Sequence, residues 1–303
     1  MGLLIKIDGD TFRTREAARV SVFDHGFLFG DSVYEVIRTY GGAPFEVGPH
    51  LARLFRSAKG ISLEVPRSKE ALAAEIGAAV REAACAGEAY VRLVVTRGVG
   101  EIDINPEVCA RPSVVLIVKD LAPWAPALYE RGTDLAIVST VTRNEPGTVD
   151  PSIKTGNYLN SVLALIEARR RGAQDAVMLN GQGHVTECTT SNIFFVKDGV
   201  LLTPSLGSGI LSGITRSDVI RLARENGVHC REGTFKADEL RRADEVFITS
   251  TTRGIMPVGT IDGKPVGDAA RRPVTDRLRK LFEEDVARFV AEARRAAPGP
   301  GAA

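Results

Sequence analysis

The chain has 303 residues, of which 44% are hydrophobic and 25% charged, so it is long enough for one large globular domain or two moderate ones. Its 39 basic and 38 acidic side chains leave a formal charge of +1, which gives no electrostatic case for binding nucleic acid or an anionic membrane. No apolar run could span a membrane, residues 1–10 do not resemble a signal peptide, and the four cysteines include no CxxC pair, so we expect a cytoplasmic protein without disulfides or metal.

The first part of the chain is rich in predicted strands. Alternating or β-branched segments occur over residues 2–10, 18–23, 89–96 and 113–119. Residues 21–45 predict a loop, a further strand and a hairpin turn at Gly41 and Gly42. These segments together indicate a sheet in this part of the chain.

Two helices are predicted between those strands, over residues 49–59 and 68–86, the second with Ser68 as its N-cap. The spacing of apolar residues in the first helix leaves Arg53 away from its apolar face, which consists of Leu51, Leu54, Phe55 and Ala58. The second helix, with Leu72, Ile76, Ala79, Val80 and Ala83 on one stripe, is expected to serve packing.

Residues 120–130, DLAPWAPALYE, carry two prolines and the only tryptophan, Trp124, between two strand-rich halves. This composition predicts a semi-rigid interdomain linker. The expected organisation is a smaller N-terminal α/β domain over 1–119, the linker, a larger C-terminal domain over 131–295 and a disordered tail over 296–303.

The second half predicts mixed α/β structure. Strands are expected over residues 134–142, 192–196 and 244–250, and a further strand is expected before a turn in the stretch DAVMLNGQG. A short amphipathic helix carries Leu159, Val162, Leu163 and Ile166 at helical spacing. A glycine-rich loop opens another helix that stops at Gly227, and a final amphipathic helix carries Leu278, Leu281, Phe282, Val286 and Phe289.

One lysine and one acid stand out in this half. Lys154 lies in a turn before the amphipathic helix, and Glu187 lies directly before a strand. A pyridoxal phosphate enzyme needs a lysine for covalent attachment of the cofactor and a carboxylate facing the ring nitrogen. Taken alone, a loop lysine is more often solvated, and the acid fits a strand edge equally well. Tyr158, one turn beyond the lysine, could bond the ring oxygen or be a half-buried core residue.

A phosphate site is suggested by the loop over residues 207–215, because it leads straight into a helix whose first N–H groups, at Ile214 and Thr215, could bind an anion. Arg53 and the hydroxyl of Thr251 could add contacts. A plain turn and a surface ion pair are the alternative interpretations of these residues. The four histidines, His50 among them, show no ligand spacing and are assigned no catalytic role.

These residues occur within a set of longer sequence matches. The chain resembles the fold-type IV, or class IV, pyridoxal phosphate aminotransferases, and most closely the branched-chain amino acid aminotransferases. The matching pieces follow the order of that family: FDHGFLFGDSVYEVIR, HLARLFRSAK, AYVRLVVTRGVG, IKTGNYLNSVLA, VTECTTSNIFFVKDGVLLTP, LSGITR and DEVFITSTTRGIMPV. The resemblance implies a two-domain α/β fold with the cofactor, pyridoxal phosphate, between the domains.

The resemblance also implies roles for single residues. Lys154 would carry the cofactor and shuttle protons, with Tyr158 at the ring oxygen and Glu187 at the ring nitrogen. The implied phosphate contacts are Arg53, Ile214, Thr215 and Thr251. The implied substrate residues are Tyr90, Arg92 and the backbone of Thr251 and Thr252 for the carboxylate, and Phe29, Tyr34, Val36, Arg38 and Trp124 around the rest of the substrate.

The resemblance further implies a homodimer or higher homo-oligomer that moves the amino group of L-leucine, L-isoleucine or L-valine to 2-oxoglutarate by a ping-pong mechanism. Two positions depart from the branched-chain pattern: Val36 stands where glycine is usual, and Phe29 where tyrosine is common. Val36 keeps open a transaminase for D-amino acids or (R)-amines. An aminodeoxychorismate lyase-like enzyme and a cofactor-binding protein without catalysis are the further alternatives.

Overall fold

The computed structural model describes residues 2–268 and 271–296, so the tail predicted over 296–303 lies, apart from Ala296, outside the described residues. The chain divides into two compact units. Unit 1 holds the chain up to Ala122, the short segment Ile153–Asn157 and the described residues from Asp285 onward. Unit 2 holds Pro123–Ser152 and Tyr158–Glu284. The units therefore do not follow chain order, in contrast to the predicted boundaries.

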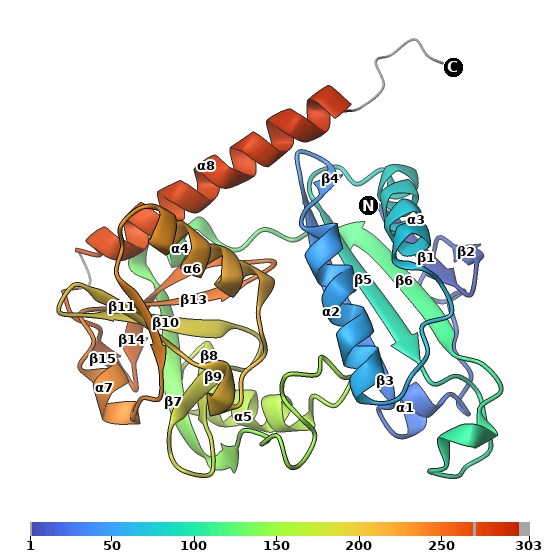
Figure 1. The fold of residues 1–303 in the computed structure, drawn as a ribbon, viewed down its shortest axis with the longest axis horizontal. Coiled ribbons are helices and arrows are strands. Elements are labelled where there is room, and N and C mark those ends of the chain that lie inside the picture. Colours follow the sequence, from blue (N-terminus) through green and yellow to red (C-terminus); the bar gives the residue numbers. More distant parts are fainter. Residues whose placement is uncertain (1, 269–270, 297–303) are drawn as a thin grey trace. The chain divides into compact units, whose positions relative to one another are not determined.

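Unit 1 is built on a six-stranded antiparallel sheet with the order β2-β1-β6-β5-β3-β4 (Figure 1). Its strands are β1 Leu3–Ile7, β2 Asp10–Phe12, β3 Ser32–Tyr40, β4 Ala43–Pro44, β5 Ala89–Thr96 and β6 Ser113–Asp120. Its helices are α1 His25–Leu28, α2 Val47–Gly60, α3 Lys69–Ala83 and the 3₁₀ turn η1 Pro106–Val108. As predicted, Ser68 caps α3 by accepting a hydrogen bond from Ala71 N.

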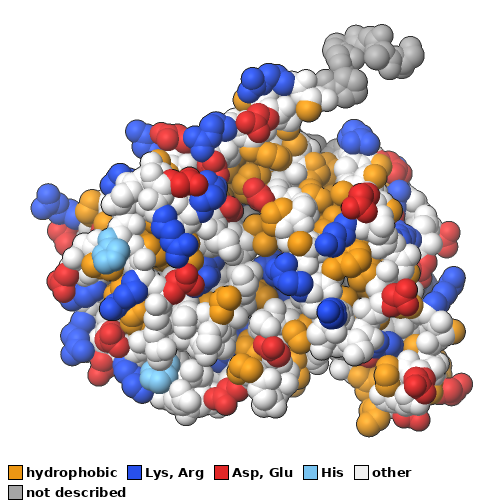
Figure 2. All heavy atoms as spheres, viewed as in Figure 1, with side chains coloured by type: hydrophobic (Ala, Val, Ile, Leu, Met, Phe, Trp, Pro, Cys, Tyr) orange, Lys and Arg blue, Asp and Glu red, His pale blue; other side chains and the backbone are white. Residues whose placement is uncertain are grey.

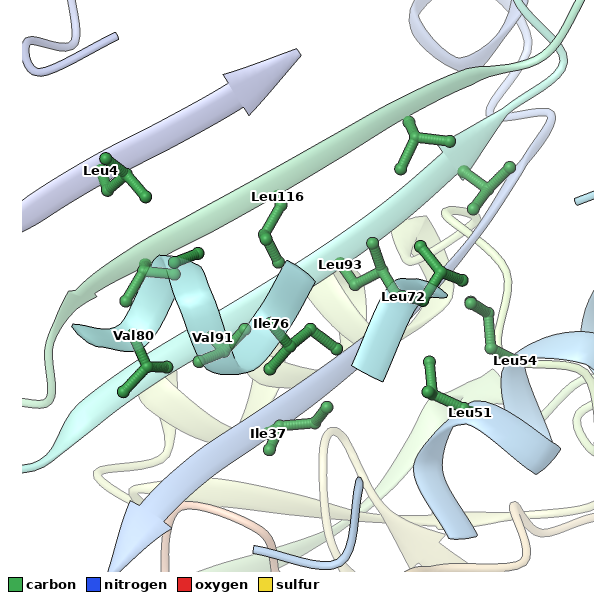
Figure 3. Close-up of a cluster of buried hydrophobic side chains, with 14 of the residues drawn as sticks. Leu4, Ile37, Leu51, Leu54, Leu72, Ile76, Val80, Val91, Leu93 and Leu116 are labelled. Carbon is green, nitrogen blue, oxygen red and sulfur yellow. The ribbon is translucent and has the colours of Figure 1, made fainter. Parts of the chain in front are cut away.

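The core of unit 1 lies between the sheet and the helices α2 and α3 (Figure 3). Alternation along β3 sends Val33 and Ile37 into this core and leaves Val36 and Arg38 only partly buried. Figure 3 shows the contributing side chains from strands and helices of the unit: Leu4, Ile37, Leu51, Leu54, Leu72, Ile76, Val80, Val91, Leu93 and Leu116. One face of the sheet is thus closed by helices.

The prediction of a strand over residues 18–23 is wrong. The segment joins no strand ladder, and Val20 and Val22 are exposed, so its alternating pattern has no neighbouring strand or core to bury against. It leads into α1, whose N-cap is Asp24.

Unit 2 contains a nine-stranded mixed sheet with the order β12-β11-β10-β13-β14-β7-β8-β9, and β15 pairs with β14 (Figure 1). Its strands are β7 Thr133–Thr142, β8 Asp175–Leu179, β9 Val185–Cys188, β10 Asn192–Lys197, β11 Val200–Pro204, β12 Cys230–Gly233, β13 Glu245–Ser250, β14 Gly254–Ile261 and β15 Lys264–Pro265. Its helices are α4 Pro126–Arg131, α5 Leu159–Arg170, the 3₁₀ turn η2 Leu206–Ser208, α6 Ile214–Glu225 and α7 Ala237–Arg241. The last helix, α8 Pro273–Ala296, begins in this unit.

Two sequence expectations in unit 2 differ from the structure. The predicted linker 120–130 contains most of α4, and Leu128 of this helix is buried in the core of the unit. Helix α5 exists, but its large apolar side chains do not face the core: Ser161, Ala164 and Ala168 are buried, whereas Leu159 is 70% exposed. Small side chains let the helix approach β7 and β8 closely, and this tertiary packing decides which face is buried.

Basic and acidic side chains are interspersed over the visible surface in Figure 2, as the near-zero formal charge leads one to expect. Within residues 2–268 and 271–296, no helix combines the length and the hydropathy that crossing a membrane requires.

Candidate active site

In unit 1, two cations lie over the ring of Tyr34 on β3. The Nζ atom of Lys154 is 4.5 Å from the ring centroid, and the Cζ atom of Arg92 is 3.9 Å from it. Arg92 on β5 pairs with Val36 in the ladder, and Tyr90 pairs with Arg38. Because side chains alternate along strands, the predicted substrate residues Tyr34, Val36, Arg38, Tyr90 and Arg92 share the sheet face opposite the helices.

The segment that carries Lys154 is fixed to this sheet by its backbone. Tyr34 N donates to the carbonyl of Lys154 at 3.0 Å, and Gly156 N donates to Ser32 O at 2.9 Å. From α2, the hydroxyl of Ser57 accepts a hydrogen bond from Lys154 N at 3.1 Å. These bonds hold the backbone of the lysine, so its side chain extends from an ordered support.

Beneath β3, the helix-covered face holds a charged cluster. Arg53 directs Nε and Nη2 at the two carboxylate oxygens of Glu35, each at 2.7 Å, and the Nδ1 atom of His50 lies 2.7 Å from Oε2. All three side chains are buried. Burial raises the pKa of Glu35, but hydrogen bonds and charge from Arg53, with His50, outweigh it and bring the pKa to about 2. The expectation that Arg53 points away from the packed face is wrong.

Burial lowers the pKa of His50, against the opposing effect of Glu35, and the charges of Arg53 and Lys154 lower it further. His50 is therefore held neutral between charged groups. Neither Glu35 nor His50 was singled out from the sequence, although a glutamate on the Val33–Ile37 face of a strand is a signal of a buried ion pair.

In unit 2, Glu187 on β9 is buried and accepts hydrogen bonds from residues of three different segments. Arg143 Nη2 donates to Oε1 at 2.6 Å, and Asn192 Nδ2 and Leu211 N donate to Oε2 at 2.9 and 3.2 Å. The carboxylate is thus held by an ion pair with Arg143 and by hydrogen bonds from Asn192 and Leu211. Arg143 follows β7 in a loop, and no motif in the sequence indicated its role.

Close to this acid lies the N-terminus of α6. Its N-cap is Gly213, a residue without a side chain that could cap the helix. A Cβ atom on Gly213 would lie 2.0 Å from Asn192 Oδ1, so glycine permits the close approach. Asn192 pairs with Thr249 on the neighbouring strand β13, which ends at Ser250. The predicted phosphate residues Ile214, Thr215 and Thr251 therefore belong to neighbouring elements of unit 2.

The remaining predicted residues are more scattered. Tyr158 is the half-buried N-cap residue of α5. Phe29 is 39% exposed and makes an edge contact with His25 in unit 1. Trp124 and Thr252 lie in unit 2, with Trp124 38% exposed.

Comparison with known proteins identifies the family. The family model described as Amino-transferase class IV matches residues 32–261. The chain belongs to the class IV aminotransferases. A Methanocaldococcus jannaschii relative provisionally named branched-chain-amino-acid aminotransferase is 41% identical, covering 90% of this chain and 93% of its own. The D-alanine aminotransferase of Listeria monocytogenes serotype 4b is 38% identical, covering 92% and 94%.

Among solved structures, the branched-chain amino acid aminotransferase of T.th., solved with pyridoxamine 5'-phosphate, has a TM-score of 0.87 and 33% identity, covering 93% of each chain. The predicted fold class, a class IV aminotransferase fold of α/β type, is confirmed. The prediction of a pyridoxal phosphate aminotransferase is likewise confirmed through this family.

The residues of this chain fit pyridoxal phosphate. In the part of the chain that the structure describes, the buried hydroxyls of Thr249 and Ser250 have no hydrogen-bond partner, and they precede the predicted phosphate contact at Thr251. The N-terminus of α6, with glycine as its N-cap residue, is a backbone arrangement suited to an anion. Within unit 2, Glu187 is an anion of the kind that a protonated ring nitrogen needs, and within unit 1, Lys154 is an amine of the kind that could bind the cofactor.

Proposed function

We propose that this class IV aminotransferase transfers the amino group of L-leucine, L-isoleucine or L-valine to 2-oxoglutarate in two half-reactions. The observation that carries the proposal is the arrangement at Tyr34, where an amine, Lys154, and a guanidinium, Arg92, lie over one ring. An amine for proton transfer and a cation for a carboxylate are what an amino acid substrate requires.

Each protein group has one task in this proposal. Lys154 would hold the cofactor covalently, and its free amine would move the proton from the substrate Cα, acting as base and then as acid. When bound, pyridoxal phosphate supplies an electron sink for the charge left at Cα. Glu187, which Arg143 holds through an ion pair, would face the ring nitrogen and keep it protonated. Arg53, Ile214, Thr215 and Thr251 hold the phosphate, and Tyr158 bonds the ring oxygen.

The substrate carboxylate is assigned to Tyr90, Arg92 and the backbone of Thr251 and Thr252. The substrate side chain is assigned to Phe29, Tyr34, Val36, Arg38 and Trp124. Val36 and the Tyr34 ring give the shared sheet face an apolar component, which suits an aliphatic side chain. The 41% identical relative, named for branched-chain substrates, supports the same choice.

A transaminase for D-amino acids is the second candidate. It is supported by the 38% identity to a D-alanine aminotransferase and by Val36. The half-reaction with the amino donor alone distinguishes the two candidate functions. Visible absorption of the purified protein is followed after adding L-leucine, D-alanine or (R)-1-phenylethylamine, without a keto acid. Fastest bleaching by L-leucine supports the proposal, and faster bleaching by D-alanine or the amine contradicts it. Pyruvate release from 4-amino-4-deoxychorismate without any acceptor would favour the lyase alternative.

We also propose that the chain forms a homodimer in the cytoplasm. Helix α5 supports self-association, because Leu159, Val162, Leu163 and Ile166 form an exposed aliphatic stripe. Their exposed fractions lie between 42% and 70%, an exposure that burial against a second copy would remove.

A further inference from the structure

Arg253, which lies in the turn between β13 and β14, joins several parts of unit 2. The Cζ atom of its guanidinium is 4.5 Å from the centroid of the Trp124 ring. Its Nη1 atom donates to the hydroxyls of Thr190, at 3.2 Å, and Ser191, at 2.5 Å. Its Nη2 atom lies 3.5 Å from Oδ2 of the buried Asp175. These five residues are termed the Arg253 cluster.

The backbone of Arg253 is attached to the same segment that carries Trp124. The hydroxyl of Tyr129, on α4, donates to Arg253 O at 2.9 Å. The segment over residues 124–129 is therefore fixed to the β13–β14 turn at both ends, by a ring contact and by a hydrogen bond. Trp124 is 38% exposed, so the guanidinium covers a ring that the core of the unit does not enclose.

The other partners of Arg253 lie beside the predicted cofactor site. Thr190 and Ser191 lie in the turn between β9, which carries Glu187, and β10, which begins at Asn192, and Asn192 donates to Glu187. Thr251 and Thr252 directly precede Arg253. One guanidinium thus links the turn beyond Glu187, the turn proposed to bind the carboxylate, and Trp124.

We propose that Arg253 is a positioning residue that sets substrate preference by fixing the Trp124 indole as one wall of the side-chain pocket. The inference rests on the proposed function, in which Trp124 contacts the substrate side chain. A planar guanidinium can stack on an aromatic ring while its N–H groups bond hydroxyls in the plane of the fork, which lysine cannot reproduce.

The proposed role of Arg253 affects the preference of the enzyme for substrates with large side chains over substrates with small ones. If the indole is held in one position, the pocket gains contact with a leucine-sized group and little with a methyl group. Each methylene that a hydrophobic pocket recognises is worth about 10-fold or more in kcat/KM. Release of Trp124 is expected to lower the leucine-to-alanine ratio of kcat/KM by about 10-fold, with a smaller change for alanine.

The test compares the wild-type holoenzyme with R253Q, and with S191A, which removes a hydroxyl partner but keeps Arg253. Trp124 is the only tryptophan, so acrylamide quenching of its fluorescence reports on this contact directly. Both variants are expected to show stronger quenching and a lower leucine-to-alanine ratio. R241Q is the matched control, because Arg241 is an exposed arginine of unit 2 paired with Asp238 and Asp262.

A wild-type leucine-to-alanine ratio in R253Q would overturn the inference, whatever the fluorescence shows. If R253Q does not fold, S191A decides in the same way. Absence of amino transfer by the wild-type chain would overturn the proposed function instead. In that case the fluorescence still tests the inference: quenching equal to that of the wild type in both variants would show that Arg253 does not hold Trp124 in place.

Discussion

Arg53 and Glu35 form a buried two-pronged ion pair, with Nε and Nη2 of the arginine each 2.7 Å from a carboxylate oxygen. The pair ties α2 to β3 on the face of the strand opposite Tyr34 and its two cations. A carboxylate and a guanidinium taken out of water together are mutually dependent, since either one alone would be an uncompensated buried charge.

This pair should make stability fall in acid. The folded pKa of Glu35 is lowered to about 2 from an ordinary 4.5, so its contribution is present above pH 4.5 and is lost as the pH falls toward 2. The loss should reach about 3 kcal/mol. His50, whose pKa is also lowered, adds a decline that begins as the pH falls below its ordinary 6.5, because the unfolded state then binds the extra proton.

Urea unfolding at pH values between 7 and 3 measures this decline. The matched variant is E35Q, which removes the titrating carboxylate, so the part of the slope below pH 4.5 should become shallower. The E35Q variant should also be less stable than the wild type at pH 7 by about 3 kcal/mol, because Arg53 remains buried without the charge of Glu35. Equal slopes for E35Q and wild type below pH 4.5 would contradict the assignment.

Replacing Glu187 with glutamine should lower kcat for amino transfer by about 100-fold or more, since a neutral amide cannot keep the ring nitrogen protonated. The change is isosteric, so the hydrogen bond from Leu211 N can persist. Steady-state assays with L-leucine and 2-oxoglutarate measure the effect, with circular dichroism as the folding control. A kcat within twofold of wild type would remove Glu187 from the proposed role.

Arg143 is expected to stabilise the protein through Glu187. R143M takes a charged donor away from the buried acid, which should cost about 3 kcal/mol of unfolding free energy. The control is R13M, because the side chain of Arg13 is 56% exposed and its ion-pair partner Glu82 is 40% exposed, and such a surface pair is worth about 1 kcal/mol or less. Equal losses of unfolding free energy in the two variants would show that the buried Arg143–Glu187 pair stabilises the protein no more than a surface ion pair does.

The sequence predicts part of this site and not the rest, for identifiable reasons. Lys154 and Glu187 could be singled out because they lie in a stretch that matches an ordered set of motifs, and the roles assigned to them stay predictions. Glu35 could have been found, since it sits on the apolar side of β3 between Val33 and Ile37. Arg143 could not, because it meets Glu187 only through the pairing of distant strands.

The orientation of α5 shows a different limit. Its sequence offers two faces, one of small residues such as Ala164 and Ala168 and one of large aliphatic residues. Hydrophobicity alone favours burial of the large face. Close packing against β7 and β8 selects the small one, and that choice depends on tertiary geometry absent from the local pattern.

The exposed stripe of α5 should support self-association. L163E places a charge within the stripe at a residue that is 45% exposed, so folding should be retained while the dimer dissociates. Sedimentation velocity should give the mass of one chain for L163E and of two for the wild type. Q182E, at an exposed turn of unit 2, is the control. A wild-type protein that sediments as a monomer would contradict the dimer.

The central claim, that Lys154 carries the cofactor, is tested most directly by chemical trapping. The pyridoxal phosphate-loaded protein is reduced with borohydride, which makes the attachment permanent, and is then digested and mapped by mass spectrometry. We predict the phosphopyridoxyl group on the peptide containing Lys154 and no stoichiometric label in K154A. Stoichiometric label on another lysine, or none on the wild type, would contradict the claim.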